Sequence, residues 1–153
     1  MVSATVPVPS VLLVGVGRFG GEHLKEWTAL AEQGAVSIAG LVVASAQSRS
    51  RLLAQTPHPV FTSLAEGLQT RPDLVDVCAP TGAHAAIVEA SLPHAHVFVE
   101  KPVATEARIA VDLFARARAE GRALLVGHIY QHHPVTKALL SEVARHGVPS
   151  QML

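Results

Sequence analysis

The chain has 153 residues, of which 49% are hydrophobic, and its 12 basic and 12 acidic side chains give a formal net charge of zero. This length suits one domain, and the balanced charge argues against partners with highly charged surfaces, such as nucleic acids or anionic membranes. No apolar run approaches the roughly 20 residues that a membrane-spanning helix needs, and the single cysteine cannot form an internal disulfide.

Residues 1–9 contain two prolines and are expected to form a flexible tail. The wholly apolar run 11–14 follows and predicts a short strand that is buried on both faces. It leads directly into Gly15-Val16-Gly17-Arg18-Phe19-Gly20, which has the spacing G-x-G-x-x-G. Apolar residues then recur at helical spacing as far as Gly34, so the glycines lie between a predicted strand and a predicted helix.

Each glycine of this loop has a distinct physical reading. Gly15 permits a tight turn, Gly17 leaves room for a pyrophosphate to approach the backbone, and Gly20 lets the helix pack closely on the strand. The free N–H groups and the positive end of the helix dipole would then face the phosphates, beside Arg18 and Phe19. The alternative is a glycine turn that holds no ligand.

Strands and helices alternate along the rest of the chain. Further strands are predicted at 36–44, 60–61, 74–79, 95–99 and 123–126, and helices at 49–54, 64–68, 81–92, 105–121 and 134–147. Ser63 with Glu66 matches a capping box, Thr81 is an expected helix cap, and 127–133 is expected to be a loop. This alternation predicts an α/β fold with a doubly wound, Rossmann-type parallel sheet in a three-layer αβα arrangement. The glycine loop after the first strand favours the strand order 3-2-1-4-5-6.

In such a sheet, ligands bind beyond the carboxyl ends of the strands. Polar residues follow several of the predicted strands at this edge, so a binding site is expected there. The candidates beyond the glycine loop are Ser45, Ala79, Pro80, Thr81, His84, Glu100, Lys101, Pro102 and His128.

Four segments together resemble the N-terminal half of the Gfo/Idh/MocA oxidoreductases. They are GVGRFG, CAPTGAH (Cys78 to His84), VEKPVA (Val99 to Ala104) and VGHIYQHHP (Val126 to Pro134), and the triplet Glu100-Lys101-Pro102 is the most specific part. The resemblance covers roughly residues 11–147. It implies binding of NAD or NADP and hydride transfer to or from a sugar, a cyclitol or a related alcohol or carbonyl compound.

The resemblance also implies roles for individual residues. Lys101 matches the catalytic lysine that touches the reacting hydroxyl group and helps its proton transfer. Glu100 and Pro102 would shape the nicotinamide end of the cofactor site, and His84 would lie near it. From position alone, an ordinary surface ion pair with Glu100 is the preferred explanation of Lys101, and the resemblance reverses that preference.

The end of the second predicted strand departs from the usual NAD pattern, which places an acidic residue there to hold the ribose hydroxyls. The residues here are Ala44-Ser45-Ala46-Gln47. Ser45 is expected to meet the adenosine ribose, and Arg49 and Arg51 are close enough in sequence to meet a 2′-phosphate. This favours NADP over NAD, while a solvated helix face is the simpler explanation for both arginines.

The resemblance further implies a C-terminal substrate domain, with residues 148–153 as its expected beginning and residues 10–147 as the NAD(P)-binding domain. We therefore expect this chain alone to be catalytically incomplete, with the segment 128–134 either mobile or packed against another copy. The expected partner is a small-molecule substrate, without nucleic acid or membrane, and the expected location is cytoplasmic. The alternatives are a non-catalytic NAD(P)-binding or sensing module and a fragment of a biliverdin-reductase-like enzyme.

Other candidate residues have simpler explanations. His128 and His132 have a spacing that could hold zinc on a helix, but Pro134 makes a helix there unfavourable, and no metal site is predicted. Cys78 lies in an apolar segment and is read as an inert core thiol. Trp27 and Phe114 belong to helical apolar stripes and are read as core residues.

Overall fold

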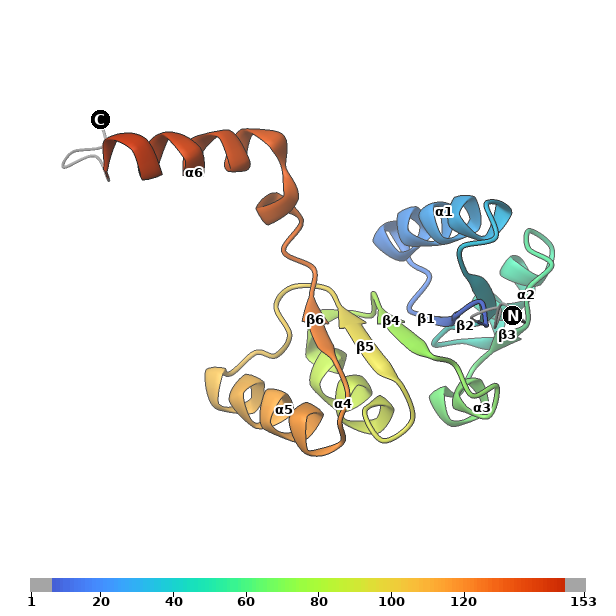
Figure 1. The fold of residues 1–153 in the computed structure, drawn as a ribbon. Coiled ribbons are helices and arrows are strands. Elements are labelled where there is room, and N and C mark those ends of the chain that lie inside the picture. The colour runs from blue at the N-terminus through green and yellow to red at the C-terminus, as the bar shows by residue number, and fades with distance from the viewer. Residues whose placement is uncertain (1–6, 148–153) are drawn as a thin grey trace, which may run out of the picture.

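The computed structural model describes residues 7–147, so most of the predicted tail and all of the predicted entrance to a second domain (148–153) lie outside the described residues. Within it, six parallel strands form one sheet in the order β3-β2-β1-β4-β5-β6, which confirms the predicted order (Figure 1). The strands are β1 (Ser10–Val14), β2 (Ser37–Val42), β3 (Val60–Phe61), β4 (Leu74–Val77), β5 (His96–Val99) and β6 (Leu124–Val126).

Helices lie on both faces of the sheet, which gives the three predicted layers. The helices are α1 (Arg18–Glu32), α2 (Ala46–Leu53), α3 (Leu64–Leu68), α4 (Thr81–Ser91), α5 (Ala107–Ala119) and α6 (Pro134–His146), with a 3-10 helix η1 (Ile129–His132) before the last. In Figure 1, α1 lies above the sheet, and α3, α4 and α5 lie below it. The doubly wound α/β fold predicted from the alternation of elements is therefore correct.

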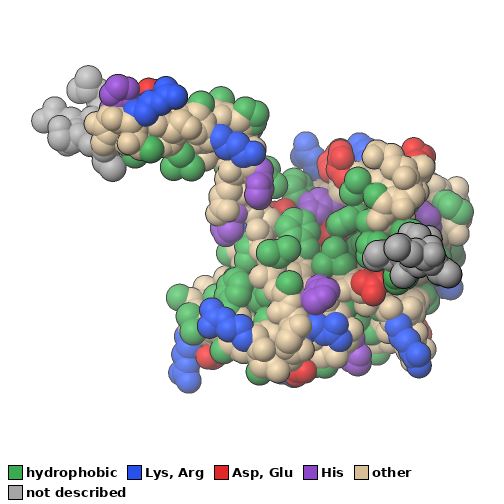
Figure 2. Space-filling view, in the orientation of Figure 1, with side chains coloured by type: hydrophobic (Ala, Val, Ile, Leu, Met, Phe, Trp, Pro, Cys, Tyr) green, Lys and Arg blue, Asp and Glu red, His purple; other side chains and the backbone are tan. Residues whose placement is uncertain are grey.

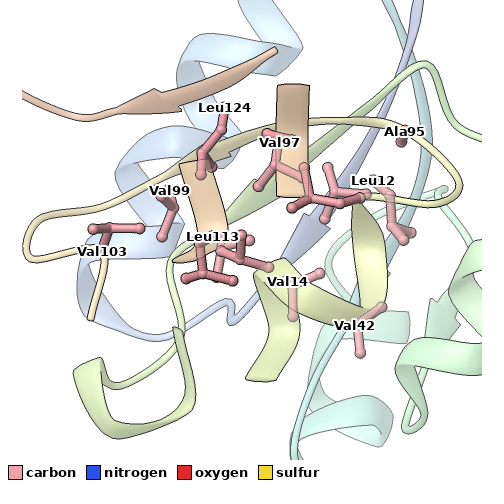
Figure 3. Close-up of a cluster of buried hydrophobic side chains, with 14 residues drawn as sticks. Leu12, Val14, Val42, Ala95, Val97, Val99, Val103, Leu113 and Leu124 are labelled. Atoms are coloured by element: carbon pink, nitrogen blue, oxygen red, sulfur yellow. The ribbon is translucent and has the colours of Figure 1, made fainter. Parts of the chain in front are cut away.

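Alternate residues of each strand point to opposite faces, so the sheet has two separate hydrophobic cores. Leu12 and Val14 of β1 join side chains from α4 and α5 in the larger core, part of which Figure 3 shows. Leu13 of the same strand faces the other way and packs with Leu52 of α2 and Leu24 of α1. A strand buried on both faces needs an unbroken apolar run, which is why 11–14 has no polar residue.

Some local predictions were wrong in detail. The second helix begins at Ala46 rather than Arg49, because the Ser45 hydroxyl accepts a hydrogen bond from the Ser48 backbone N–H at 3.1 Å and caps the helix. Pro80, not Thr81, is the N-cap of α4, and Ser63 makes no side-chain capping bond to α3. The predicted loop 127–133 contains η1.

Helix α6 extends away from the sheet and contacts η1 (Figure 1). Its residues Val135, Leu139 and Leu140 are exposed, as are Ile129 and Tyr130 of η1. The amphipathic pattern that forms the helix thus has no partner among residues 7–147. No helix in that part of the chain is both long and apolar enough to cross a membrane.

Candidate functional site

The glycine loop joins β1 to α1 by very close backbone packing. Gly15 has φ +93°, and a Cβ added there would lie 2.5 Å from the backbone nitrogen of Ala79. A Cβ on Gly20 would collide with the carbonyl oxygen of Gly15. The fold itself therefore requires glycine at both positions.

Gly17 differs from Gly15 and Gly20 because no packing contact within the described residues 7–147 excludes a side chain there. It is the N-cap of α1, its φ and ψ are extended, and a Cβ would meet no atom within 4 Å. The side of Gly17 without a Cβ opens to the outside, next to the N-terminal turn of a helix that carries no acidic residue in that turn. This arrangement suits the approach of an anion to free backbone N–H groups.

A cavity of about 550 Å³ lies at the carboxyl edge of the sheet and collects most of the predicted nicotinamide-end residues. In Figure 2, which has the orientation of Figure 1, the projecting α6 stands clear of the rest of the domain. The exposed Lys101 borders the cavity from the loop after β5, and Phe19 borders it from the glycine loop. The remaining lining residues are Cys78, Ala79, Pro80, Thr81, His84, Glu100, Gly127, His128, Ile129, Tyr130 and Gln131.

The other predicted site residues lie outside this cavity. Gly17 and Arg18 border a groove of about 1200 Å³ between α1 and α2, and Arg51 borders the same groove. The Ser45 hydroxyl, besides capping α2, donates to Ser48 Oγ at 3.1 Å, and Ser45 borders neither cavity. Arg49 donates from Nε to the carbonyl oxygen of Val60 at 2.8 Å, so it ties α2 to β3.

His84 links the loops after β4 and β5. It is buried, and its ring nitrogens lie 2.8 Å from the carbonyl oxygen of Pro102 and 2.7 Å from that of Ala79. The Lys101–Pro102 peptide bond is cis. His84 therefore holds together two loops that line the cavity, while Pro102 itself borders a neighbouring hollow with His128.

Sequence reasoning missed a buried polar cluster between α1 and β4. Asp76 of β4 is fully buried, and its Oδ2 accepts hydrogen bonds from His23 Nδ1 at 2.8 Å and from Trp27 Nε1 at 2.6 Å. Trp27 is therefore half-buried with a polar role and is not simply a core residue. The available signal was an aspartate in the middle of an apolar strand, because a carboxylate is buried only with partners.

His23 extends this cluster toward the loop that carries Lys101. Its Nε2 lies 3.5 Å from Oε1 of Glu100, and its ring stacks on Phe98 with centroids 5.9 Å apart. The hydrogen bond to Asp76 is the main cause that raises the pKa of His23 above the ordinary value, although burial opposes it.

Cys78 completes this neighbourhood. Its Sγ lies 3.6 Å from Oδ1 of Asp76, and burial raises the pKa of the thiol, so little thiolate is present at neutral pH. Ligand atoms of His23, Asp76 and Cys78 lie within 4.8 Å of one another. Because the aspartate already accepts two ring N–H groups and the thiol stays protonated, the cluster is a hydrogen-bonded one.

Comparison with a family of known proteins identifies the fold more closely. The family described as an oxidoreductase family with an NAD-binding Rossmann fold, GFO_IDH_MocA, matches residues 10–128. No match to a curated protein was found.

Several solved structures are similar to the chain. One is UDP-N-acetylglucosamine 3-dehydrogenase GnnA from Acidithiobacillus ferrooxidans, at 25% identity and a TM-score of 0.77, covering 88% of this chain and 43% of that one. Another is GenD2 from gentamicin A biosynthesis in complex with NAD, at 26% identity and a TM-score of 0.81, covering 93% and 40%. Biliverdin reductase from Synechocystis, in complex with biliverdin and NADP+, shares the fold at 21% identity and a TM-score of 0.78, covering 90% and 43%. The chain thus spans less than half the length of these proteins.

Proposed function

Since the chain belongs to the Gfo/Idh/MocA family of oxidoreductases with an NAD-binding Rossmann fold, we propose that it binds the dinucleotide along the carboxyl edge of its sheet and serves hydride transfer on a sugar-type alcohol or carbonyl compound. The observation that carries this proposal is the shared cavity, which Lys101 and Phe19 of the glycine loop both line. One ligand that reached from Gly17 into this cavity would contact both the phosphate-binding turn and the lysine.

Different residues of the site would contact different parts of the cofactor. The open side of Gly17 and the first turn of α1 receive the pyrophosphate, with Gly15 and Gly20 shaping the turn. Thr81, Ala79 and Pro80 border the nicotinamide end, and His84 keeps their loop next to Pro102. When bound, the nicotinamide would supply or accept the hydride.

Lys101 is the proposed catalytic residue. Its side chain is exposed and borders the cavity together with His128 and the buried Glu100, so it can reach a substrate oxygen. An ammonium group donates to a carbonyl or alkoxide oxygen and can exchange a proton with it. Support for a sugar-type substrate comes from the sugar-nucleotide dehydrogenase and the aminoglycoside-pathway protein among the similar structures.

We also propose that NADP is accepted at least as well as NAD. No acidic residue follows β2 to repel a 2′-phosphate, and the exposed Arg51 borders the groove that Gly17 and Arg18 line. Arg49 is the weaker candidate, because its Nε already donates to Val60.

The site can be tested by NMR on the chain itself. Addition of NADH should shift the backbone amide signals of Gly17, Thr81 and Lys101 most, and leave that of Lys137 on the projecting α6 unchanged. Shifts confined to residues away from the glycine loop would contradict the proposal. A phosphate-sized anion such as inorganic pyrophosphate should reproduce the shift at Gly17 but not the shift at Lys101.

An assay of hydride transfer tests whether the chain alone is a catalyst. We expect NADH and NADPH binding without measurable hydride transfer to sugar nucleotides, cyclitols or biliverdin, because residues 7–147 leave Ile129 and Tyr130 uncovered beside Lys101. A substrate held by so few groups is not fixed near the nicotinamide, and misplacement by about 1 Å can cost on the order of a hundredfold in rate. Turnover at ordinary enzyme rates, lost in Lys101→Met but kept in Lys137→Met, would show that the chain is a complete catalyst.

The alternative is a non-catalytic module that binds NAD(P) and reports it to a protein partner. It predicts the same binding, and it differs in the role of Lys101, which such a module does not need. A Lys101→Met substitution that left the cofactor-induced amide shifts around Thr81 and His128 wholly unchanged would favour this alternative.

A further inference from the structure

Glu100 carries a buried carboxylate oxygen without a hydrogen-bond donor. Its Oε1 has no hydrogen-bond partner among residues 7–147, and His23 Nε2 lies 3.5 Å from it. Its Oε2 accepts from the backbone N–H of Lys101 at 3.3 Å. A Cβ on Gly127 would lie 2.5 Å from Oε1, so the glycine makes room for this carboxylate. An unpaired buried carboxylate is costly, so the position requires a compensating proton or charge.

The hydrogen-bond donors and acceptors around His23 indicate that the compensating proton lies on its ring. Asp76 Oδ2 already accepts from Trp27 Nε1, and His23 Nδ1 lies 2.8 Å from the same oxygen, which makes Nδ1 the donor. A neutral ring then presents the bare lone pair of Nε2 to Oε1 of Glu100, and two acceptors face each other. A second proton on the ring converts both contacts into charge-assisted ones.

The surroundings of His23 support a positive charge there. Asp76 of β4 and Glu100 after β5 are the carboxylates that face the ring, and the Cys78 thiol lies beside Asp76. Glu22 and Glu26 of α1 itself border the small hollow next to His23, and Lys25 pairs with Glu22 at 2.8 Å. No lysine or arginine among residues 7–147 borders that hollow.

We propose that His23, as an imidazolium held between Asp76 and Glu100, is a positioning residue that fixes the Glu100–Lys101 segment for the bound cofactor. The chain of contacts runs from β4 through α1 to the carboxylate whose other oxygen receives the Lys101 N–H. This inference rests on the proposed function, in that the cofactor binds beside Lys101. Loss of the ring proton frees Glu100 and loosens the backbone at Lys101, so cofactor affinity falls as pH rises.

The positioning role can be tested without a cofactor by NMR on the nitrogen-15-labelled chain. Both ring nitrogens of His23 should be protonated at pH 7, above the ordinary histidine pKa of about 6.5. The Lys101 amide signal should shift with the same midpoint as the His23 ring. A neutral His23 at pH 7, as when Glu100 carries the proton instead, or a Lys101 amide that ignores the His23 titration, would overturn the proposal.

Variants separate this linkage from a general loss of structure. In Glu100→Gln, His23 should still titrate while the Lys101 amide no longer follows it. In His23→Gln, the Lys101 amide should become independent of pH. His94→Gln, a change at an exposed histidine between α4 and β5, should behave as the parent chain. If the Lys101 amide signal still followed the His23 titration in Glu100→Gln, this would contradict the proposed path of contacts.

NADH fluorescence titrations then measure the functional consequence. The dissociation constant of the parent chain should rise about tenfold between about pH 6 and about pH 9. His23→Gln should bind weakly at both values, and His94→Gln should match the parent chain. Tight binding by His23→Gln at both values would overturn the inference and leave the proposed function intact. Absence of NADH binding by the parent chain would instead contradict the proposed function. The His23 ring titration and the pH dependence of the Lys101 amide signal would still decide the positioning role.

Discussion

At the scale of single residues, the three glycines of one short loop have three different physical reasons. Gly15 lies at a positive φ against the backbone of Ala79, and Gly20 lies against the carbonyl oxygen of Gly15, so internal packing excludes any side chain at both. Gly17 is free of such contacts. Besides its place as the N-cap of α1, the reason that we propose for glycine at this position is the approach of a ligand from outside, and this makes Gly17 the most informative residue to change.

Gly17→Val should therefore abolish NADH binding and change stability little. The extended φ and ψ of Gly17 accommodate a β-branched side chain, so the expected loss is about 1 kcal/mol for a poorer helix N-cap. Calorimetric titration with NADH and thermal unfolding by circular dichroism give the two readouts.

Two other glycine substitutions are the controls. Gly21→Ala, in open space on α1, should keep both stability and binding. Gly15→Ala should lose at least about 2 kcal/mol of stability through strain and the clash with Ala79. Unchanged NADH affinity in Gly17→Val would refute the assignment of the pyrophosphate to this loop.

At the scale of elements, the N-terminus of α2 lies at the end of β2, where the preference for NAD or NADP is expected to be set. Its N-cap is Ser45, whose hydroxyl accepts the Ser48 N–H, and aspartate is an equally good N-cap residue. A carboxylate can thus be placed at the end of β2 without loss of the helix. The exposed Arg51 of the same helix borders the groove beside Gly17.

Ser45→Asp should shift the cofactor preference toward NADH by about tenfold relative to NADPH, because the carboxylate repels a 2′-phosphate and accepts hydrogen bonds from ribose hydroxyls. Parallel fluorescence titrations with the two cofactors measure the ratio of dissociation constants. Ser50→Asp adds the same charge at an exposed position of α2 and should leave the ratio within about twofold. An equal ratio in Ser45→Asp and Ser50→Asp would show that the adenosine end does not lie at the end of β2.

At the scale of the whole molecule, two ionisable groups give stability opposite pH dependences. The pKa of His23 is raised in the folded state, mainly by its hydrogen bond to Asp76. Its contribution is complete below the unfolded value of about 6.5 and is lost as pH rises through the folded value. The pKa of Asp73 is lowered by hydrogen bonds from Ser10, so its contribution is complete above the unfolded value and lost as pH falls through the folded one.

The melting temperature should therefore decline on the alkaline side, starting near about pH 6.5, and again at acid pH. His23→Gln should remove most of the alkaline decline, whereas Ser10→Ala, which removes the hydroxyl that donates to Asp73, should reduce the acid decline and leave the alkaline decline unchanged. Thermal unfolding across pH measures both. An alkaline decline that survives intact in His23→Gln would assign it to another group.

Helix α6 and the 3-10 helix η1 present an exposed apolar surface. Val135, Leu139 and Leu140 of α6 are exposed, and so are Ile129 and Tyr130 of η1. Burial of apolar area favours association by about 25 cal/mol per Å², so we expect the isolated chain to self-associate through this surface. Sedimentation velocity should show a dimer or larger species that Leu139→Glu with Leu140→Glu converts to a monomer. Val111→Glu, at an equally exposed apolar residue of α5, should leave the assembly unchanged.

The sequence by itself determined the order of the elements, the parallel sheet and the glycine loop. These features depend on signals within a few residues of one another: the apolar run before Gly15, helical periodicity, and glycine or proline at element ends. The strand order followed because right-handed crossovers leave few alternatives once the glycine loop marks the first strand. The N-cap at Ser45 also depends on local sequence, but Ser45 was interpreted as a ribose contact and its role as a helix cap was not predicted.

Only the tertiary structure decided the contacts that set the chemistry. His23 and Asp76 are 53 positions apart, and Arg49 reaches Val60 across a turn, so no local pattern joins them. Their pairing depends on how α1 packs over β4 and how α2 packs beside β3, and packing is determined by the shapes of all the side chains together. The aspartate inside an apolar strand indicated that a partner had to exist, because a buried carboxylate must be paired; the fold alone selected which histidine would be its partner.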